Sequence, residues 1–269
     1  MAHNVEKEAA ARASLRFVHD GAIVGLGSGS TATDVVRLLG ERVRAGLRIR
    51  GVPTSRHTAE LATAAEIPLT TFDQIQEIDV TIDGADEFDP QLTLIKGGGG
   101  ALPHEKVVAS ESRQLVIVTD SSKQVPVLGK FPLPVEVIAF AEPLVKKKIE
   151  ALGASVALRQ SNGEACVTDE GHHILDCSFG QILDPPSLAR KLSDMPGIVE
   201  HGLFIGMACV VLIARGKDVT ELNRENIHGR LGLSCGAQDE TLFLLAALQN
   251  PNVCSRWRAA KRSYPRPFA

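Results

Sequence analysis

The stretch AIVGLGSGSTATDVVRLLGERVRAG, residues 22–46, decides the fold class. Its first residues are apolar or glycine and predict a short buried strand. The residues from Thr31 onward have apolar side chains at helical spacing, at Val35, Val36, Leu38, Leu39 and Val43. The glycines and serines between the two predict a tight turn. A strand, a glycine turn and a helix in this order form the repeating unit of a doubly wound α/β sheet.

The same unit recurs through the first half of the chain. Four further segments read as strands that end in turns, with helical patterns between them: LRIRGVPTS (47–55), EIDVTID (77–83), LTLIKGGGG (92–100) and QLVIVTD (114–120). We therefore expect a doubly wound, mostly parallel, Rossmann-like sheet. Ligands of such sheets bind at the carboxyl ends of the strands, so the turns should meet at one edge.

The pattern changes at KFPLPVEVI, residues 130–138, where two prolines interrupt it. A helix, strands joined by Asn-Gly and Glu-Gly turns, and a second helix follow, which predicts a smaller α+β, ferredoxin-like lobe inserted into the first domain. A last apolar strand returns to the first sheet. The expected division is a Rossmann-like catalytic domain at 1–130 and 206–223, the lobe at 131–205, and an atypical C-terminal extension without a catalytic part at 224–269.

Composition narrows the class of partner. Aromatic residues make up 4% of the chain and apolar residues 44%, which favours a core of Val, Ile, Leu and Ala. A net charge of −3 argues against general binding to nucleic acid or to an anionic membrane. No segment approaches the ~18 apolar residues of a membrane span, and no export signal is expected at the start. Five cysteines without a CxxC pair indicate reduced thiols in the cytoplasm.

The turn GLGSGST, residues 25–31, predicts a phosphate site. It offers backbone N–H groups at a helix start and the hydroxyls of Ser28, Ser30 and Thr31. A dinucleotide fingerprint would need a third glycine where Ser30 stands, and a P-loop would need a lysine, so a phosphomonoester is favoured over a nucleotide. A plain helix cap after a tight turn is the structural alternative.

The segment TIDGADEFDP, residues 81–90, places four acids directly after a buried strand. A calcium loop is disfavoured because the other EF-hand ligands are missing and the stretch does not join two helices. We expect Asp83 and Asp86 to hold the hydroxyls of a sugar, with one of them able to move protons during ring opening. Glu87 and Asp89 are expected to form a solvated face.

Two further turns supply cations and a base. KGGGG places Lys96 beside four glycines. So many glycines imply either a backbone conformation that other residues rarely adopt or a ligand that needs close approach to the backbone. Pro103 fits the first turn of the next helix, which brings Glu105 beside the glycine loop. Lys123 ends the next strand. One carboxylate, two lysines and a phosphate cradle predict proton transfer between C1 and C2 of a sugar phosphate, with Glu105 as the base.

The chain resembles the type A ribose-5-phosphate isomerases of the pentose phosphate pathway. The resemblance covers roughly residues 5–223 and lies in GLGSGST, DGADE, KGGGGAL followed by HEK, DSSK and LGKFPLPVEVI, in the family's order and spacing. It implies interconversion of ribose 5-phosphate and ribulose 5-phosphate through an enediolate, without a metal or organic cofactor, by a homodimer or homotetramer. The catalytic residues it implies are Glu105, Asp83 and Lys96. The substrate-binding residues it implies are Ser28, Gly29, Ser30, Thr31, Asp83, Gly84, Ala85, Asp86, Lys96, Gly97, Gly98, Gly99 and Lys123.

One position supports the resemblance and two depart from the family pattern. Lys7 falls where the family often has a lysine near the site. His104 stands where many members have arginine, and Cys209 stands where an aspartate is common.

The adjacent His172 and His173 would point to opposite faces of a strand, which disfavours a metal site there.

Two functions from other classes remain as alternatives. A non-catalytic sugar-phosphate sensor would keep the phosphate loop without needing Glu105, and would require a DNA-reading module that the sequence does not show. A nicotinamide-dependent oxidoreductase would need the missing fingerprint. Cofactor-free turnover separates the isomerase from the oxidoreductase.

Overall fold

The computed structural model describes residues 2–224. This part contains a six-stranded sheet with the strand order β15-β14-β6-β3-β1-β2, in which the neighbouring strands are parallel except for β15, which pairs antiparallel with β14. The predicted mostly parallel α/β sheet is confirmed. The strands are β1 Ile23–Leu26, β2 Arg50–Pro53, β3 Ile78–Asp83, β6 Ser112–Asp120, β14 Val210–Arg215 and β15 Asp218–Asn223.

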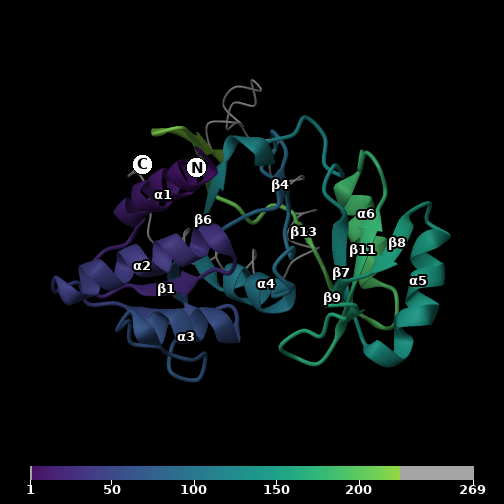
Figure 1. Ribbon diagram of the computed structural model, residues 1–269, viewed down its shortest axis with the longest axis horizontal. Coiled ribbons are helices and arrows are strands. Elements are labelled where there is room, and N and C mark those ends of the chain that lie inside the picture. The colour runs from purple at the N-terminus through teal and green to yellow at the C-terminus, as the bar shows by residue number, and fades with distance from the viewer. Residues whose placement is uncertain (1, 225–269) are drawn as a thin grey trace, which may run out of the picture. The chain divides into compact units, whose positions relative to one another are not determined.

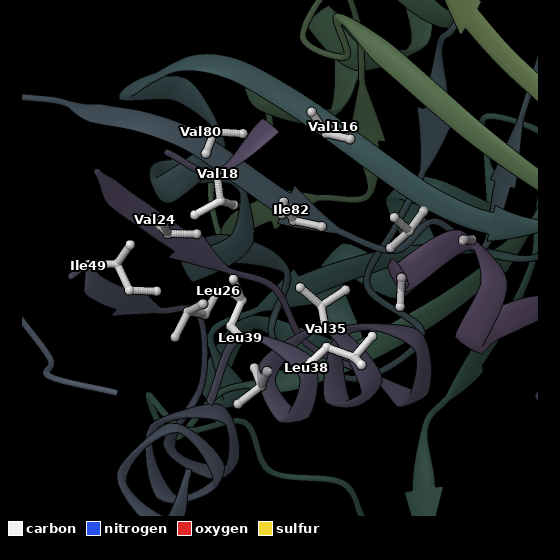
Figure 2. Close-up of a cluster of buried hydrophobic side chains, with 14 of the residues drawn as sticks. Val18, Val24, Leu26, Val35, Leu38, Leu39, Ile49, Val80, Ile82 and Val116 are labelled. Carbon is white, nitrogen blue, oxygen red and sulfur yellow. The ribbon is translucent and has the colours of Figure 1, made fainter. Parts of the chain in front are cut away.

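Helices cover both faces of this sheet (Figure 1). Side chains of a strand alternate between the two faces, so Val24 and Leu26 of β1 pack with Leu39 of α2 in the cluster of Figure 2. Ile23 points the other way and packs with Val108 of α4. The helices are α1 Ala2–Ser14, α2 Ser30–Arg44, α3 Arg56–Ala64 and α4 Leu102–Ser110, and the 3₁₀ turn η1 (Leu15–Phe17) continues α1.

Gly25 allows α4 to lie close to the sheet. A Cβ atom at this position would stand 1.8 Å from Thr81 Oγ1 of β3 and 2.7 Å from Val108 Cγ1 of α4. Both distances are far below van der Waals contact, so a larger residue would push the helix away. This close contact holds the last turn of α4, at Val108, against β1 and β3.

A second sheet has the strand order β12-β7-β11-β8, with antiparallel neighbours throughout. Its elements follow the β-α-β-β-α-β order of the ferredoxin-like motif. Both helices bury apolar side chains against one face of the sheet, at Val145 and Ile149 of the first and Leu192 of the second. The elements are β7 Leu133–Val137, η3 Ala139–Ala141, α5 Glu142–Glu150, β8 Ser155–Leu158, β11 His173–Ser178, α6 Pro185–Ser193 and β12 Ile198–His201, with the short hairpin β9 Gln160–Ser161 and β10 Glu164–Ala165 between β8 and β11.

One expected strand does not belong to the parallel sheet. The segment before the four glycines forms β5 (Leu94–Ile95), which pairs antiparallel with β4 (Glu87–Phe88) and β13 (Leu203–Phe204) in a separate three-stranded sheet. Its apolar residues are buried on this small sheet, so burial alone did not identify the correct partner strands. The glycine loop therefore reaches the site from beside the large sheet, not from one of its strand ends.

Apart from Arg224, the predicted C-terminal extension at 224–269 lies outside the described residues. Among residues 2–224, the longest helices are too short or too polar to cross a lipid bilayer.

Candidate active site

A pocket with a volume of about 140 Å³ opens where β1, β3 and β6 end. The start of α4 and the glycine loop after β5 complete its wall. The sequence-predicted residues that line it are Ser28, Gly29, Ser30, Thr31, Gly84, Ala85, Asp86, Lys96, Gly97, Gly99, Glu105 and Lys123. Segments that are far apart in the sequence therefore meet in one place, as expected from the ends of parallel strands.

The loop after β1 forms one wall with the character of an anion site. Gly29 precedes the first turn of α2 with φ of 87°, a left-handed conformation that favours glycine. The first N–H groups of a helix have no partner within the helix and carry a partial positive charge. Lys7 of α1 lines the same wall and donates to Ser30 Oγ at 2.8 Å. This wall combines backbone donors, hydroxyls and one ammonium group.

Hydroxyl groups behind this wall fix the position of Ser28. Its Oγ lies 2.7 Å from Thr54 Oγ1 and 3.1 Å from Ser55 Oγ, at the end of β2. Thr58 Oγ1 in turn donates to the carbonyl oxygen of Gly27 at 3.1 Å. The sequence analysis did not assign Thr54 and Ser55 this role in holding the loop.

Glu105 stands in the first turn of α4. Its backbone N–H donates to the carbonyl oxygen of Ala101 at 3.0 Å, and Pro103 occupies the start of the helix as predicted. The side chain is 3% exposed although it carries a carboxylate. Its Oε2 lies 3.3 Å from Lys96 Nζ. A buried carboxylate requires such a partner, so the two residues form one unit.

Lys96 connects the acidic groups of the site. Its ammonium lies 2.9 Å from Asp83 Oδ2 and donates to the carbonyl oxygen of Gly84 at 2.7 Å. Burial disfavours the charged form, but the carboxylates of Asp83 and Glu105 outweigh this effect and raise the pKa of Lys96. Lys96 is therefore an ammonium throughout the physiological pH range.

The environment of Lys96 favours its charged form, whereas the environment of Glu105 favours the neutral carboxyl group. Burial raises the pKa of Glu105 and Lys96 lowers it; with the carboxylates of Asp83 and Asp86, which also raise it, the resulting pKa is about 8. A carboxyl group with a pKa near the working pH can both accept and return a proton. This property suits a general acid–base group, and Glu105 has it in this pocket.

Two predicted residues do not reach the pocket wall. Asp83 is completely buried and accepts hydrogen bonds from the backbone N–H groups of Ser28 at 3.1 Å and Gly84 at 2.7 Å, besides its contact with Lys96. Gly98 faces Asp86 and donates its N–H to Asp86 Oδ2 at 2.7 Å. In this structure Asp86, not Asp83, presents its carboxylate at the pocket surface.

The expectation of a solvated face at Glu87 and Asp89 is wrong. Glu87 is 2% exposed and accepts hydrogen bonds from the N–H groups of Gly129 and Phe131, at 2.6 and 3.1 Å. Asp89 is also buried and accepts from the N–H groups of Gln91 and Thr93. Acidic side chains that satisfy the N–H groups of turns have the same sequence signature as acidic side chains in solvent.

The end of β6 adds residues that sequence reasoning did not select. Val118, Thr119 and Asp120 line the pocket beside Lys123, which lies in the 3₁₀ turn η2 (Ser121–Lys123). Asp120 caps this turn by accepting from the N–H of Ser122 at 2.9 Å. Their position at the carboxyl end of a parallel strand was the available signal.

The two departures from the family pattern lie outside the pocket wall. His104 Nε2 is 3.0 Å from Glu170 Oε1 on the segment between β10 and β11. Cys209 precedes β14 and is half-buried. His172 pairs with the buried Glu136 at 2.9 Å. Within residues 2–224, the histidines, cysteines and acids form no group of three or more arranged to hold a metal ion.

Comparison with known proteins identifies relatives over most of the chain. The family model of ribose 5-phosphate isomerase A (phosphoriboisomerase A) matches residues 50–218. The ribose-5-phosphate isomerase A of Bradyrhizobium diazoefficiens is 49% identical over 236 residues, which are 84% of this chain and 98% of the relative. That of Rhodopseudomonas palustris is 50% identical over 228 residues, covering 82% of this chain and 98% of the relative.

Solved structures agree with this similarity. A D-ribose-5-phosphate isomerase in complex with phospho-erythronic acid superimposes with a TM-score of 0.80 at 37% identity, over 83% of this chain and 100% of the other. The ribose 5-phosphate isomerase A of Methanocaldococcus jannaschii superimposes with a TM-score of 0.78 at 38% identity, over 83% of this chain and 100% of the other.

Proposed function

The chain belongs to the ribose 5-phosphate isomerase A family, and we propose that its pocket interconverts D-ribose 5-phosphate and D-ribulose 5-phosphate through an enediolate. The observation that supports this most strongly is the contact of the buried Glu105 with Lys96, beside a loop suited to a phosphate group. The reaction belongs to the non-oxidative part of the pentose phosphate pathway.

In the forward direction, Glu105 removes the proton from C2 of the open-chain aldose. The C2–H bond breaks, a C1–C2 double bond forms, and the electrons of the aldehyde C=O bond move to O1. Glu105 then delivers its proton to C1, while the proton of the C2 hydroxyl is transferred to O1 and C2 becomes the carbonyl carbon. One carboxyl group serves both steps, because C1 and C2 are neighbours on the same face of the enediolate.

The negative charge that develops on oxygen needs hydrogen-bond donors fixed in advance. We assign this role to the Lys96 ammonium and to N–H groups of the glycine loop, of which Gly97 and Gly99 line the pocket. Asp86 binds sugar hydroxyls at the pocket surface. Asp83 contributes from behind, because its contact with Lys96 at 2.9 Å holds the ammonium in place.

The phosphate group is anchored by residues 28–31 at the start of α2, with Lys7 and Lys123 as nearby cations. The carboxylate of phospho-erythronic acid resembles the planar, anionic C1–C2 unit of the enediolate. We therefore expect this compound, which is bound in one of the related structures, to compete with ribose 5-phosphate here as well.

The double variant Ser30→Ala, Thr31→Ala tests the phosphate site. Hydrogen bonds to a charged group contribute about 1.5–3 kcal/mol, so KM for ribose 5-phosphate should rise roughly 10-fold or more with a smaller change in kcat. Initial-rate kinetics measure both constants. Thr33→Ala, in the same helical turn but outside the pocket, is the matched control. An unchanged KM in the double variant would mean that the phosphate binds elsewhere.

The raised pKa of Glu105 predicts the pH profile. The base must be ionised to accept a proton, and its pKa is about 8, so kcat/KM should fall about tenfold per unit as pH decreases below that value. The profile should level off above it, since Lys96 keeps its charge. Measurements from pH 6.5 to 9.5 avoid the second ionisation of the substrate phosphate, near about 6. A flat profile over this range would contradict the assignment.

Direct assay of the purified chain tests the proposed activity. Ribose 5-phosphate is incubated without nucleotide cofactors and in the presence of a chelator, and ribulose 5-phosphate is measured. Conversion supports the isomerase. Binding without conversion would favour the sugar-phosphate sensor, and conversion that requires a nicotinamide cofactor would favour an oxidoreductase.

We further propose a homodimer or homotetramer located in the cytoplasm. The strongly exposed Phe140 and Leu183, 95% and 79% exposed in the single chain, support assembly, and the free thiols of Cys166, Cys177 and Cys209 fit a reducing compartment. Light scattering measures the mass of the particle in solution, and a monomer would contradict the proposed assembly.

The separate sheets support a catalytic domain at 1–130 and 206–223 and a lobe at 131–205.

A further inference from the structure

Arg159, which follows β8 in the smaller lobe, reaches the glycine loop of the active site. Its Nη1 donates to the carbonyl oxygen of Gly97 at 2.8 Å and to that of Gly98 at 3.1 Å. The guanidinium is itself held by Asp176 of β11, through Nε to Oδ2 at 3.0 Å and through Nη2 to Oδ1. A two-point contact with a carboxylate fixes the plane of the guanidinium, and its remaining donors are therefore directed at the loop.

The first of these contacts fixes a peptide group from both ends. In a trans peptide the C=O and N–H bonds point in opposite directions, and residues 2–224 contain no cis peptide. The carbonyl of Gly97 faces Arg159, and the N–H at the other end of the same peptide, that of Gly98, donates to Asp86 Oδ2 at 2.7 Å. Arg159 and Asp86 thus hold opposite ends of one peptide group.

The second contact directs a hydrogen-bond donor. Arg159 also holds the carbonyl of Gly98, so the N–H of Gly99 must point away from the guanidinium. Gly99 lines the pocket, whereas Arg159 does not. The carbonyls of Gly97 and Gly98 both face Arg159, so the N–H of Gly99, like that of Gly98, points away from the lobe.

The loop needs an external support of this kind. Gly97 has φ of 101°, and a Cβ atom on Gly98 would stand 2.5 Å from Asp86 Oδ1, so both positions require glycine. Four consecutive glycines have no side chains with which to fix their own peptide planes. Arg159 supplies two fixed hydrogen bonds to this otherwise permissive segment.

We propose that Arg159 is a positioning residue of the isomerisation: anchored by Asp176, it sets the orientation of Asp86 and of the Gly99 N–H toward the reacting sugar. This inference rests on the proposed function. It assigns part of the catalytic geometry to the smaller lobe, through a residue that touches the glycine loop and not the substrate.

The variant Arg159→Met removes the donors and keeps most of the aliphatic stem. A displacement of catalytic groups by about 1 Å can cost on the order of 10²-fold, so kcat should fall about 10- to 100-fold. Inhibition by phospho-erythronic acid should weaken by a similar factor, because it depends on the same donors. Inhibition by inorganic phosphate should stay within about twofold of the wild type, because residues 28–31 are not affected.

Arg113→Met is the matched control, since Arg113 pairs with Glu77 and Asp79 on the surface away from the pocket. It should leave kcat and both inhibition constants unchanged. Asp86→Asn completes a double-mutant cycle with Arg159→Met. If Arg159 acts through Asp86 and the shared peptide, the combined loss in kcat should be clearly smaller than the product of the single losses.

Arg159→Lys keeps the charge but not the planar guanidinium group. It should show smaller losses in kcat and in inhibition by phospho-erythronic acid than Arg159→Met. Wild-type kcat and inhibition constants in both Arg159 variants would overturn the proposal, as would fully multiplicative losses with Asp86→Asn. If Arg159→Met does not fold, Arg159→Lys alone decides in the same way. A wild-type chain that does not convert ribose 5-phosphate would instead refute the proposed function itself.

Discussion

Replacing Glu105 with glutamine is expected to lower kcat for ribose 5-phosphate by roughly 10² to 10⁴, the range that general acid–base catalysis contributes. The amide has nearly the shape of the carboxyl group but cannot accept a proton from carbon. The phosphate loop is unchanged, so inhibition by inorganic phosphate should persist. Steady-state kinetics and inhibition assays on the purified variant measure both effects.

Glu111→Gln provides the control for this variant. It makes the same substitution directly after the last residue of α4, outside the pocket, and should keep wild-type kcat. Near-normal turnover in Glu105→Gln would remove Glu105 from the role of base. Equal losses in the two variants would indicate damage to the helix and not to the chemistry.

Replacing Lys96 with methionine should have the second large effect. The ammonium is the ion-pair partner of both Asp83 and Glu105, and the side chain is 2% exposed. Its removal takes a preorganised donor from the developing oxyanion, which typically costs about 10² to 10³ in kcat. It also leaves two carboxylates buried without their cation, which should lower the free energy of unfolding by about 3–5 kcal/mol at pH 9.

The stability loss should depend on pH in a defined direction. Lys96 lowers the pKa of Glu105, so the variant raises this pKa further above its unfolded value. A carboxyl group shifted in this way contributes stability that is fully present below its unfolded pKa and is lost as pH rises through the folded pKa. The deficit of Lys96→Met should therefore be smaller at pH 6 than at pH 9.

Chemical denaturation at the two pH values measures this deficit. Lys147→Met, at an exposed position of α5, is the control and should stay within about 0.5 kcal/mol of the wild type at both. A deficit for Lys96→Met that is small at pH 9, or larger at pH 6, would contradict the ion-pair geometry described for the site.

The sequence was sufficient where local pattern determines structure. The turn at 25–31 and Pro103 specify a strand-turn-helix unit and a helix start; the structure has both, and residues 28–31 and Glu105 line the pocket. The order of the motifs predicted that Lys96 and Lys123 would come together with them, and both line the pocket. Such features depend on neighbours in the sequence and on the known edge of a parallel sheet.

The sequence was insufficient where long-range packing decides. The residues of β5 have the same apolar character as those of a parallel strand, and only the partner strands β4 and β13 distinguish the two cases. Asp83 ends β3 and Asp86 follows it in the next turn, yet Asp83 is buried beside Lys96 and Asp86 faces the pocket. Arg159 lies 61 residues along the chain from Gly98, and no local signal connects them.

Deuterium transfer from solvent tests the central assignment most directly. Ribose 5-phosphate is brought to equilibrium with the enzyme in D₂O, and NMR follows the hydrogens at C2 of ribose 5-phosphate and at C1 of ribulose 5-phosphate. If Glu105 removes and returns the proton at these carbons and exchanges it with solvent over repeated turnovers, both positions should gain deuterium with the wild type, and Glu105→Gln should do so more slowly by about the factor lost in kcat. Deuterium uptake at the wild-type rate by Glu105→Gln would contradict it.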